Sequence, residues 1–438
     1  MTRRSVAILT ALVLGAALVG CSPGADNKTE PDDIIVIDYE AIVWQPGAVA
    51  ANKAIVDAWN NANPNVQVNL IEGAWSGMLE KMTTGFEAGK VPDVFHYDAK
   101  RIGIFAQQGH ILNLDPYISD SQRDDIHEGA WQTLQFEDRE GTYGIPFLQE
   151  TDVVFANRTI LEAAGVVLPT MDAPWTWEDY RQVSKQLTVD SNGDGTPEVW
   201  GGGVPLENSA SRILRLALGN DGFFFSNDGE SDEVVFGAAE QLVPEAIHGM
   251  IFEDRSVDPG NIGFNTEDML PNFFAGKTAT FLGESWVRDL LNTGAPDGFE
   301  WVLLPPLFAT SFNQPSDTQA LAVTAVSEHP EEAAAFVSFF TNAQNQIQMA
   351  LGDGLVATSK EALRSAELTT SEQGWDIVSA MGAYLIEAPY QRVLALPEWA
   401  DRVANPAFDR YFRDQIDLDE LRRLLVDEGN RVLERYAG

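Results

Sequence analysis

Residues 142–157 constrain the fold of this chain more than any other segment, because they place a polar cluster between two strand-like stretches. The flanks, 143–147 and 153–155, are rich in β-branched, aromatic and other apolar residues, as strands are. Residues 149–152 contain neither glycine nor an Asn-Gly pair, so the segment lacks the signature of a hairpin. We therefore predict one extended segment that leaves one hydrophobic core and enters another. A crevice between two lobes is a usual place for a ligand, so its polar groups are candidates for binding.

Chain length and charge narrow the possible classes. A chain of 438 residues is too long for one core, so two α/β units are expected. The net charge of -38 argues against nucleic acid as a partner, and against anionic ligands held by the overall field. A solvated acidic surface is the simplest interpretation of this charge.

The first 33 residues predict secretion and lipid anchoring. Arg3 and Arg4 precede an apolar run over 6–19, which suits a signal peptide but is short for a spanning helix. Cys21, the only cysteine, follows directly, as in a bacterial lipobox. We expect residues 1–20 to be removed, Cys21 to be lipidated, and residues 21–33 to form a flexible tether on the cell membrane. The alternative is an ordinary signal peptide with an accidental cysteine. Either interpretation places the folded body outside the cytoplasm.

The next segments predict a parallel α/β sheet. Apolar residues 34–37, the alternating stretch 66–70 and residues 92–95 suit strands, and helical spacing separates them. Strand–helix–strand order favours right-handed parallel crossovers. Ligand groups in such sheets lie on the loops that follow the strands. The side chains of interest in these loops are Trp44, Glu72, Trp75, Tyr97, Asp98 and Arg101.

Several short motifs, in a shared order, resemble those of one protein family. They are residues 92–95 followed by 105–109, 144–146 followed by 155–158, 164–165 followed by 174–178, then 274–279, 304–305 and 330–334. In this order the chain resembles the bacterial extracellular solute-binding proteins (family 1, maltose-binding type), the capture components of ABC sugar importers. The resemblance implies a two-lobed, type II periplasmic-binding-protein fold with hinge strands between the lobes. It implies one lobe from 34–148 and 307–342, and a second from 149–306 and 343–438.

The resemblance also implies where a carbohydrate would bind. Aromatic rings would stack on the sugar, and charged or amide groups would bond its hydroxyls, with charge-assisted bonds the stronger kind. Glu150 matches a hinge carboxylate, Tyr97 an aromatic position, Arg101 a basic one, and Trp286 a stacking position whose motif is one residue longer here. Core packing or solvation is the competing interpretation for each. The remaining lobe-two candidates are Glu207, Asn208, Asp353 and Trp399, of which Trp399 is also a plausible core residue and Asp353 a plausible turn residue.

One further motif has the oxygen spacing of a calcium loop. Asp190, Asn192 and Asp194 precede Gly195, but the twelfth position is Gly201, which supplies no bidentate carboxylate. A polar turn is therefore favoured over a calcium site. The five histidines show no metal-binding spacing, and no cofactor is expected.

Two classes of function remain. The chain is expected to be a monomeric binder that captures a mono- or oligosaccharide, docks on ABC permease subunits and performs no reaction. The alternative is a secreted glycosidase in which Glu150 and either Asp152 or Glu207 act as an acid–base pair. The sequence does not reveal which sugar binds.

Overall fold

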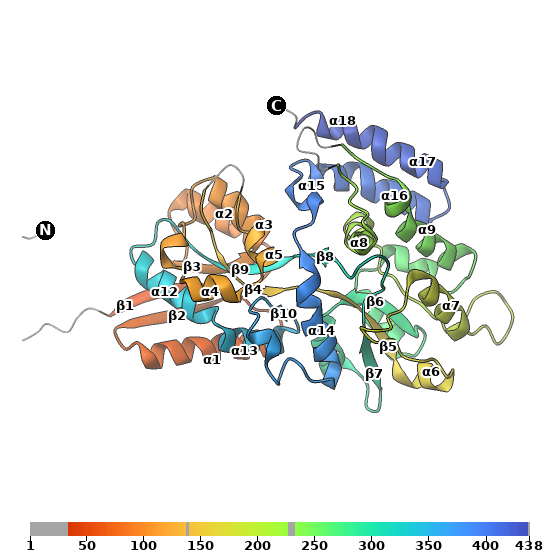
Figure 1. Ribbon diagram of the computed structural model, residues 1–438, viewed down its shortest axis with the longest axis horizontal. Helices are drawn as coiled ribbons and strands as arrows, with labels where there is room; N and C mark the ends of the chain where they lie inside the picture. Colours follow the sequence, from red (N-terminus) through yellow and green to blue (C-terminus); the bar gives the residue numbers. More distant parts are fainter. Residues whose placement is uncertain (1–33, 137–139, 227–232, 437–438) are drawn as a thin grey trace, which may run out of the picture.

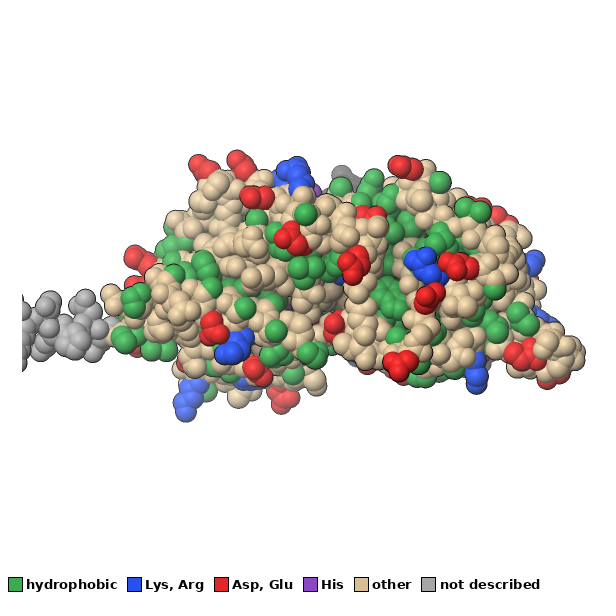
Figure 2. Space-filling model, turned by 90° about the horizontal axis from the view of Figure 1, so that it is seen from below, with side chains coloured by type: hydrophobic (Ala, Val, Ile, Leu, Met, Phe, Trp, Pro, Cys, Tyr) green, Lys and Arg blue, Asp and Glu red, His purple; other side chains and the backbone are tan. Residues whose placement is uncertain are grey.

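The computed structural model describes residues 34–136, 140–226 and 233–436. The predicted signal peptide, Cys21 and the tether lie outside these residues. Two lobes lie side by side, and the chain passes between them more than once (Figure 1). Within the described ranges, no helix combines the length and apolar character that crossing a membrane requires. Acidic side chains are scattered over both lobes on the face seen from below, with few basic ones between them (Figure 2).

A mixed six-stranded sheet forms the first lobe, in the order β10-β4-β9-β3-β1-β2. Strand β1 pairs in parallel with β2 and β3, as predicted for the first three strands of the chain. The pairs formed by β9 and β10 are antiparallel. The strands are β1 (Ile35–Ile42), β2 (Val66–Gly73), β3 (Val94–Asp98), β4 (Ile145–Gln149), β9 (Thr318–Val323) and β10 (Val356–Ala357). The helices of this lobe are α1 (Pro46–Ala62), α2 (Met78–Ala88), α3 (Ala99–Gln107), α4 (Asp120–Asp125), α5 (Glu128–Gln132), α12 (Pro330–Phe340), α13 (Ala343–Asp353) and α14 (Trp375–Met381).

Both faces of this sheet are buried, which explains its nearly continuous apolar strands. On one face, the ring of Tyr39 lies 5.3 Å from that of Phe336 on α12. On the other, Phe95 packs beside Phe105 of α3. Helices therefore cover the sheet on two sides and leave its strand ends to the loops.

A three-stranded antiparallel sheet, in the order β6-β5-β7, organises the second lobe. Its strands are β5 (Asp152–Asn157), β6 (Thr280–Glu284) and β7 (Trp301–Leu304), and β8 (Gln314–Pro315) pairs separately with β11 (Leu385–Ile386). The helices are α6 (Arg158–Ala163), α7 (Trp177–Leu187), α8 (Ser209–Ala217), α9 (Ala238–Phe252), α10 (Leu270–Phe274), α11 (Val287–Gly294), α15 (Leu396–Trp399), α16 (Asn405–Phe412), α17 (Leu418–Arg423) and α18 (Gly429–Leu433).

The predicted crossing is confirmed. Strand β4 pairs with β9 in the first sheet, whereas β5 pairs with β6 and β7 in the second. Only Glu150 and Thr151 separate the two strands. The polar cluster of this segment therefore lies where the chain passes from one lobe to the other.

Two predicted lobe boundaries need correction. Backbone hydrogen bonds join Phe308 to Trp175 and Thr310 to Gly219, so the chain remains with the second lobe beyond residue 307. Helix α13 packs against α1, and β10 extends the first sheet beside β4, so residues 343–357 belong with the first lobe rather than the second.

The two hydrophobic cores are also less separate than predicted. One apolar cluster includes Tyr39 and Phe147 of the first sheet together with Phe155 and Leu303 of the second. Gly374, just before α14, contacts Leu303 so closely that a Cβ there would lie 2.8 Å from the leucine side chain. The lobes therefore share an apolar contact near α14, while a second cluster lies wholly in the second lobe.

Candidate functional site

Two strands that pass between the lobes are fastened to each other at the crossing. The Gln314 side chain accepts hydrogen bonds from the Thr151 hydroxyl (2.8 Å) and the Asp152 amide (2.7 Å). Its Nε2 donates to the Asp152 carbonyl at 2.9 Å. Because these groups are buried and mutually satisfied, the backbone on either side of Glu150 is held in a defined position.

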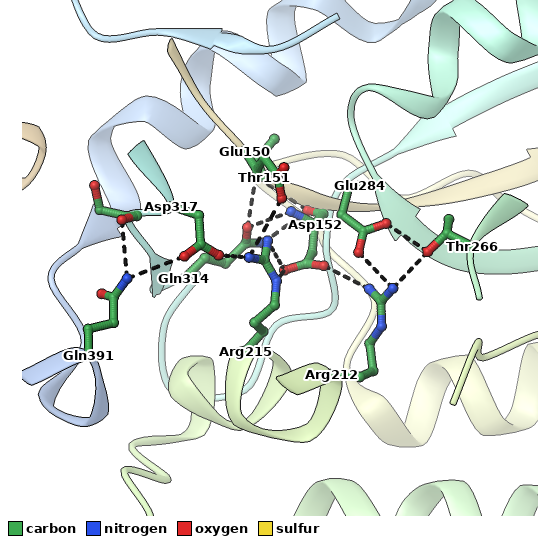
Figure 3. A network of polar contacts seen from close by, with 11 residues as sticks. Glu150, Thr151, Asp152, Arg212, Arg215, Thr266, Glu284, Gln314, Asp317 and Gln391 are labelled. Carbon is green, nitrogen blue, oxygen red and sulfur yellow. Dashed lines mark hydrogen bonds and ion pairs between the residues drawn. The ribbon is translucent and has the colours of Figure 1, made fainter. Parts of the chain in front are cut away.

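A buried ion network extends from this crossing into the second lobe (Figure 3). Arg212 and Arg215 lie three positions apart on α8, so they share one helix face. Both contact Asp152 at 3.0 Å, through opposite carboxylate oxygens. Arg212 also contacts Glu284 of β6 at 2.7 Å, and Arg215 pairs with Asp317. Each arginine is therefore neutralised by carboxylates from other segments, as a buried charge requires.

Glu150 is the least neutralised carboxylate in this network. Its side chain is 32% exposed and lies 3.9 Å from Arg215. Burial raises the pKa of Glu150 to about 7, opposed by Arg215 and reinforced by Glu284 and Asp152. Burial opposes the charge of Arg215 too, but the surrounding carboxylates outweigh it and raise the pKa of Arg215. Glu150 therefore retains the capacity to accept a hydrogen bond from a ligand hydroxyl at the crossing.

An aromatic pair joins the two lobes beside the crossing. The indole rings of Trp44, after β1, and Trp286, after β6, lie edge to face with centroids 5.2 Å apart. Nε2 of the neighbouring Gln45 donates to the Trp286 carbonyl at 3.3 Å. Gly354, with φ of 73°, lies close to Trp286, where a Cβ would stand 3.2 Å from its Cα. Residues from both lobes thus surround one indole pair.

Unpartnered polar atoms surround this pair. Among the described residues, Oε1 of Gln45, Oδ1 of Asp353 and Oγ of Ser285 are buried and make no hydrogen bond. Burial raises the pKa of Asp353 to about 7, opposed by a hydrogen bond with the Trp44 side chain. Buried acceptors are normally paired, so these three are available to ligand hydroxyls or to water. Asp353 is the last residue of α13 and is 2% exposed, so it is buried at a helix end rather than placed in the turn that was the competing interpretation.

Trp75 and Tyr97 form a second aromatic pair on the first lobe, in which Tyr97 is buried at 3% exposure. Trp75 is 36% exposed, and its ring centroid lies 6.0 Å from that of Tyr97. The Arg101 guanidinium lies 5.8 Å from the Tyr97 ring and pairs with Asp98 at 3.1 Å. Asp98 also caps α3 by accepting from the Arg101 amide, which gives it a structural role. Glu72 was expected on a loop, but it is an exposed residue near the end of β2.

Of the remaining candidates in the second lobe, two are exposed and one is buried in the core. Glu207 and Asn208 are exposed at the start of α8, the helix that carries Arg212 and Arg215. Trp399 is fully buried, donates to the Leu425 carbonyl at 3.3 Å and packs 5.0 Å from the Phe225 ring. The ligand role predicted for Trp399 is therefore wrong, because the residue is part of the second lobe's core.

The candidate calcium loop forms a series of tight turns. Asp190 accepts from the amides of Gly193 and Gly195, and Asn192 accepts from that of Asp194. Within the part of the chain that the structure describes, no group of three or more His, Cys, Asp or Glu side chains is arranged to hold a metal ion. These contacts favour the polar turn.

Several polar residues at the crossing were missed from the sequence: Arg212, Arg215, Glu284, Gln314 and Asp317. The three-residue spacing of the two arginines, which places them on one face of a helix, was an available signal. Lys100, at the start of α3, was also missed. Partial desolvation lowers the pKa of its ammonium group, Asp98 opposes this, and the positive charges of Arg101 and of Arg215 in the other lobe lower the pKa further.

Comparison with known proteins was consistent in sequence and in structure. The family described as bacterial extracellular solute-binding protein matches residues 45–347. An uncharacterized lipoprotein from the oleD 5′ region of Streptomyces antibioticus is 36% identical over 426 residues, which cover 96% of this chain and 90% of that protein.

Two solved structures share the fold. The sugar-binding protein MalE of Xanthomonas citri superposes with a TM-score of 0.76 at 17% identity, covering 92% of this chain and 98% of its own. The GacH receptor of Streptomyces glaucescens superposes with a TM-score of 0.73 at 18% identity, covering 91% and 98%.

Proposed function

Because the chain belongs to the bacterial extracellular solute-binding protein family, we propose that it captures a mono- or oligosaccharide between its lobes and delivers it unchanged to a membrane permease. The contact between Trp44 and Trp286 is the observation that carries this proposal. Rings from both lobes meet beside unpartnered acceptors, and a sugar offers an apolar ring face together with hydroxyl donors. The structures of GacH with acarbose lend support from a protein of the same fold.

Binding between lobes suggests how capture is coupled to closure. A sugar that first contacts one lobe recruits groups from the other, and closure is favoured by the contacts present only in the closed state. Trp44, Gln45 and Asp353 come from the first lobe, and Ser285 and Trp286 from the second. The closed form is the one that docks on the permease, and the chain acts as a monomer.

Cys21 would hold this body at the membrane. Lipidation of Cys21 and a tether over 21–33 would let it search the space near the permease while staying outside the cytoplasm. The lipoprotein of Streptomyces antibioticus supports this part of the proposal.

The arrangement at the crossing does not favour glycoside hydrolysis. Each carboxylate oxygen of Asp152 forms an ion pair with an arginine, and the side chain is buried. Asp152 is therefore not placed to activate a water molecule or to attack a sugar. Glu150 therefore has no partner in Asp152 for the acid–base pair that a glycosidase needs.

A thermal-shift screen over a carbohydrate panel tests the proposal, because a ligand that binds only the folded state raises its stability. We expect one class of carbohydrate to raise Tm, and the same sugar to show no new reducing ends after incubation. A panel without any shift would reject carbohydrate capture, and steady release of reducing ends would favour the glycosidase.

A further inference from the structure

The C-terminal helices border an open pocket that is remote from the crossing. It has a volume of about 350 Å³ and lies between the segment 402–410 and the segment 424–435. The helices α16 to α18 lie at the outer edge of the second lobe (Figure 1). A pocket of this volume matches the lower range of small-molecule sites.

The charged residues that line this pocket are mostly basic, whereas those of the whole chain are mostly acidic. Its floor is apolar, and its rim carries four arginines: Arg402, Arg410, Arg431 and Arg435. The chain as a whole has 66 acidic and only 28 basic residues. Four guanidinium groups on one small rim are therefore a local reversal of charge.

The nearby carboxylates use only part of the hydrogen-bonding capacity of these arginines. Glu398 pairs with Arg402 at 3.1 Å and with Arg435 at 2.9 Å, and Glu428 pairs with Arg431 at 2.7 Å. These two carboxylates pair with three of the four guanidinium groups, and the fourth, Arg410, lies near Glu420, whose pKa it helps to lower. No carboxylate of the described residues forms an ion pair with Arg410.

We infer that this pocket binds a phosphate group attached to an apolar moiety. Arginine presents a planar fork of donors that matches phosphate oxygens, and each guanidinium retains donors beyond those used by one carboxylate. Val403, Ala407, Leu424 and Val432 supply apolar surface next to these donors. A phospholipid headgroup at the membrane and a soluble phosphate ester share this chemistry.

Two arms of one experiment distinguish these sources. The chain carries Cys21→Ser, so that no lipid can be attached. Calorimetric titrations use inorganic phosphate and glycerol 1-phosphate. Sedimentation assays use vesicles of phosphatidylcholine with and without phosphatidylglycerol. The pocket variant is Arg410→Gln with Arg431→Gln, and the matched control is Arg413→Gln with Arg423→Gln.

The control removes two exposed arginines of the same region that pair with Asp409 and Glu420 and do not line the pocket. We expect the parent chain to bind a soluble phosphate or phosphatidylglycerol vesicles, and the pocket variant to bind about tenfold or more weakly, as for lost charge-assisted hydrogen bonds. The control should stay within about twofold of the parent chain.

Binding of the soluble probes alone would identify a soluble ester, and binding of the acidic vesicles alone a lipid headgroup. No binding of any probe by the parent chain, or equal weakening by the control, would overturn the inference. If the double variant fails to fold, Arg410→Gln alone serves in its place, because it disrupts no ion pair among the described residues.

Discussion

The Trp286 ring lies edge to face against Trp44, although one indole belongs to each lobe. Each ring follows a strand of a different sheet, β1 for Trp44 and β6 for Trp286. The contact therefore depends on how the two lobes approach each other. A sugar bound beside this indole pair would therefore contact both lobes only when they are closed.

Removal of the Trp286 ring should weaken carbohydrate binding. We expect Trp286→Ala to reduce affinity by about 1–3 kcal/mol, the range for losing a buried aromatic contact. Trp286→Phe retains a smaller ring and should recover part of this loss. Calorimetric titration with a sugar from the panel measures both. Unchanged affinity in Trp286→Ala, with the fold intact, would remove this residue from the site.

Loss of Arg215 should destabilise the second lobe. Arg215→Met leaves Asp152 with one cationic partner instead of two, and breaking a buried ion network costs about 3–5 kcal/mol. Arg423→Met removes an exposed pair with Glu420 and should cost about 1 kcal/mol or less. Urea denaturation measures both free energies of unfolding. Similar losses in the two variants would show that the network contributes little.

Carbohydrate affinity should depend on the ionisation of Glu150. Its pKa is raised to about 7, chiefly by burial, so it gains negative charge as the pH rises through that value. The carboxylate accepts hydrogen bonds from sugar hydroxyls more strongly than the neutral acid does. Affinity should therefore rise between about pH 6 and about pH 8. Glu150→Gln cannot ionise and should lose most of this dependence, and an unchanged pH profile in that variant would exclude Glu150 as its source.

The unliganded protein should become less stable as the pH rises, because the buried Asp353 carboxyl group then loses its proton. Burial raises the pKa of Asp353 from 3.8 to about 7, with a smaller contribution from Asp289. The folded state holds this proton more tightly than the unfolded chain, so its contribution to stability is complete below the unfolded pKa and is lost as the pH rises through about 7. Glu150 acts in the same direction.

The measurement is Tm between about pH 5 and about pH 8. Asp353→Asn should flatten the decline, and the double variant with Glu150→Gln should flatten it further. Asp401→Asn, at an exposed position of the second lobe, is the matched control and should leave the decline unchanged. A decline of equal slope in Asp353→Asn would contradict this prediction.

The crossing between the lobes was predictable from the sequence because its signal is local. Apolar strands on either side of 149–152, without turn residues, leave few alternatives to an extended passage. The parallel start of the first sheet was predictable for the same reason. The two-residue strand β10 was not, since it is too short to carry a periodic pattern, and α13 was therefore assigned to the wrong lobe.

The site was less predictable because it depends on burial and on contacts between distant segments. Trp399 follows a proline and a glutamate, and that local pattern does not distinguish a core indole from a stacking one. Arg212 and Arg215 look like surface residues until Asp152 and Glu284 are placed against them. The free acceptors near Trp286 become visible only when both lobes are present.

The most direct test is calorimetric titration with the carbohydrate that most raises Tm, followed by analysis of the recovered ligand. Capture between the lobes predicts saturation at one sugar per chain and recovery of that sugar with its chain length unchanged. Absence of saturable carbohydrate binding, or recovery of shortened chains, would contradict it.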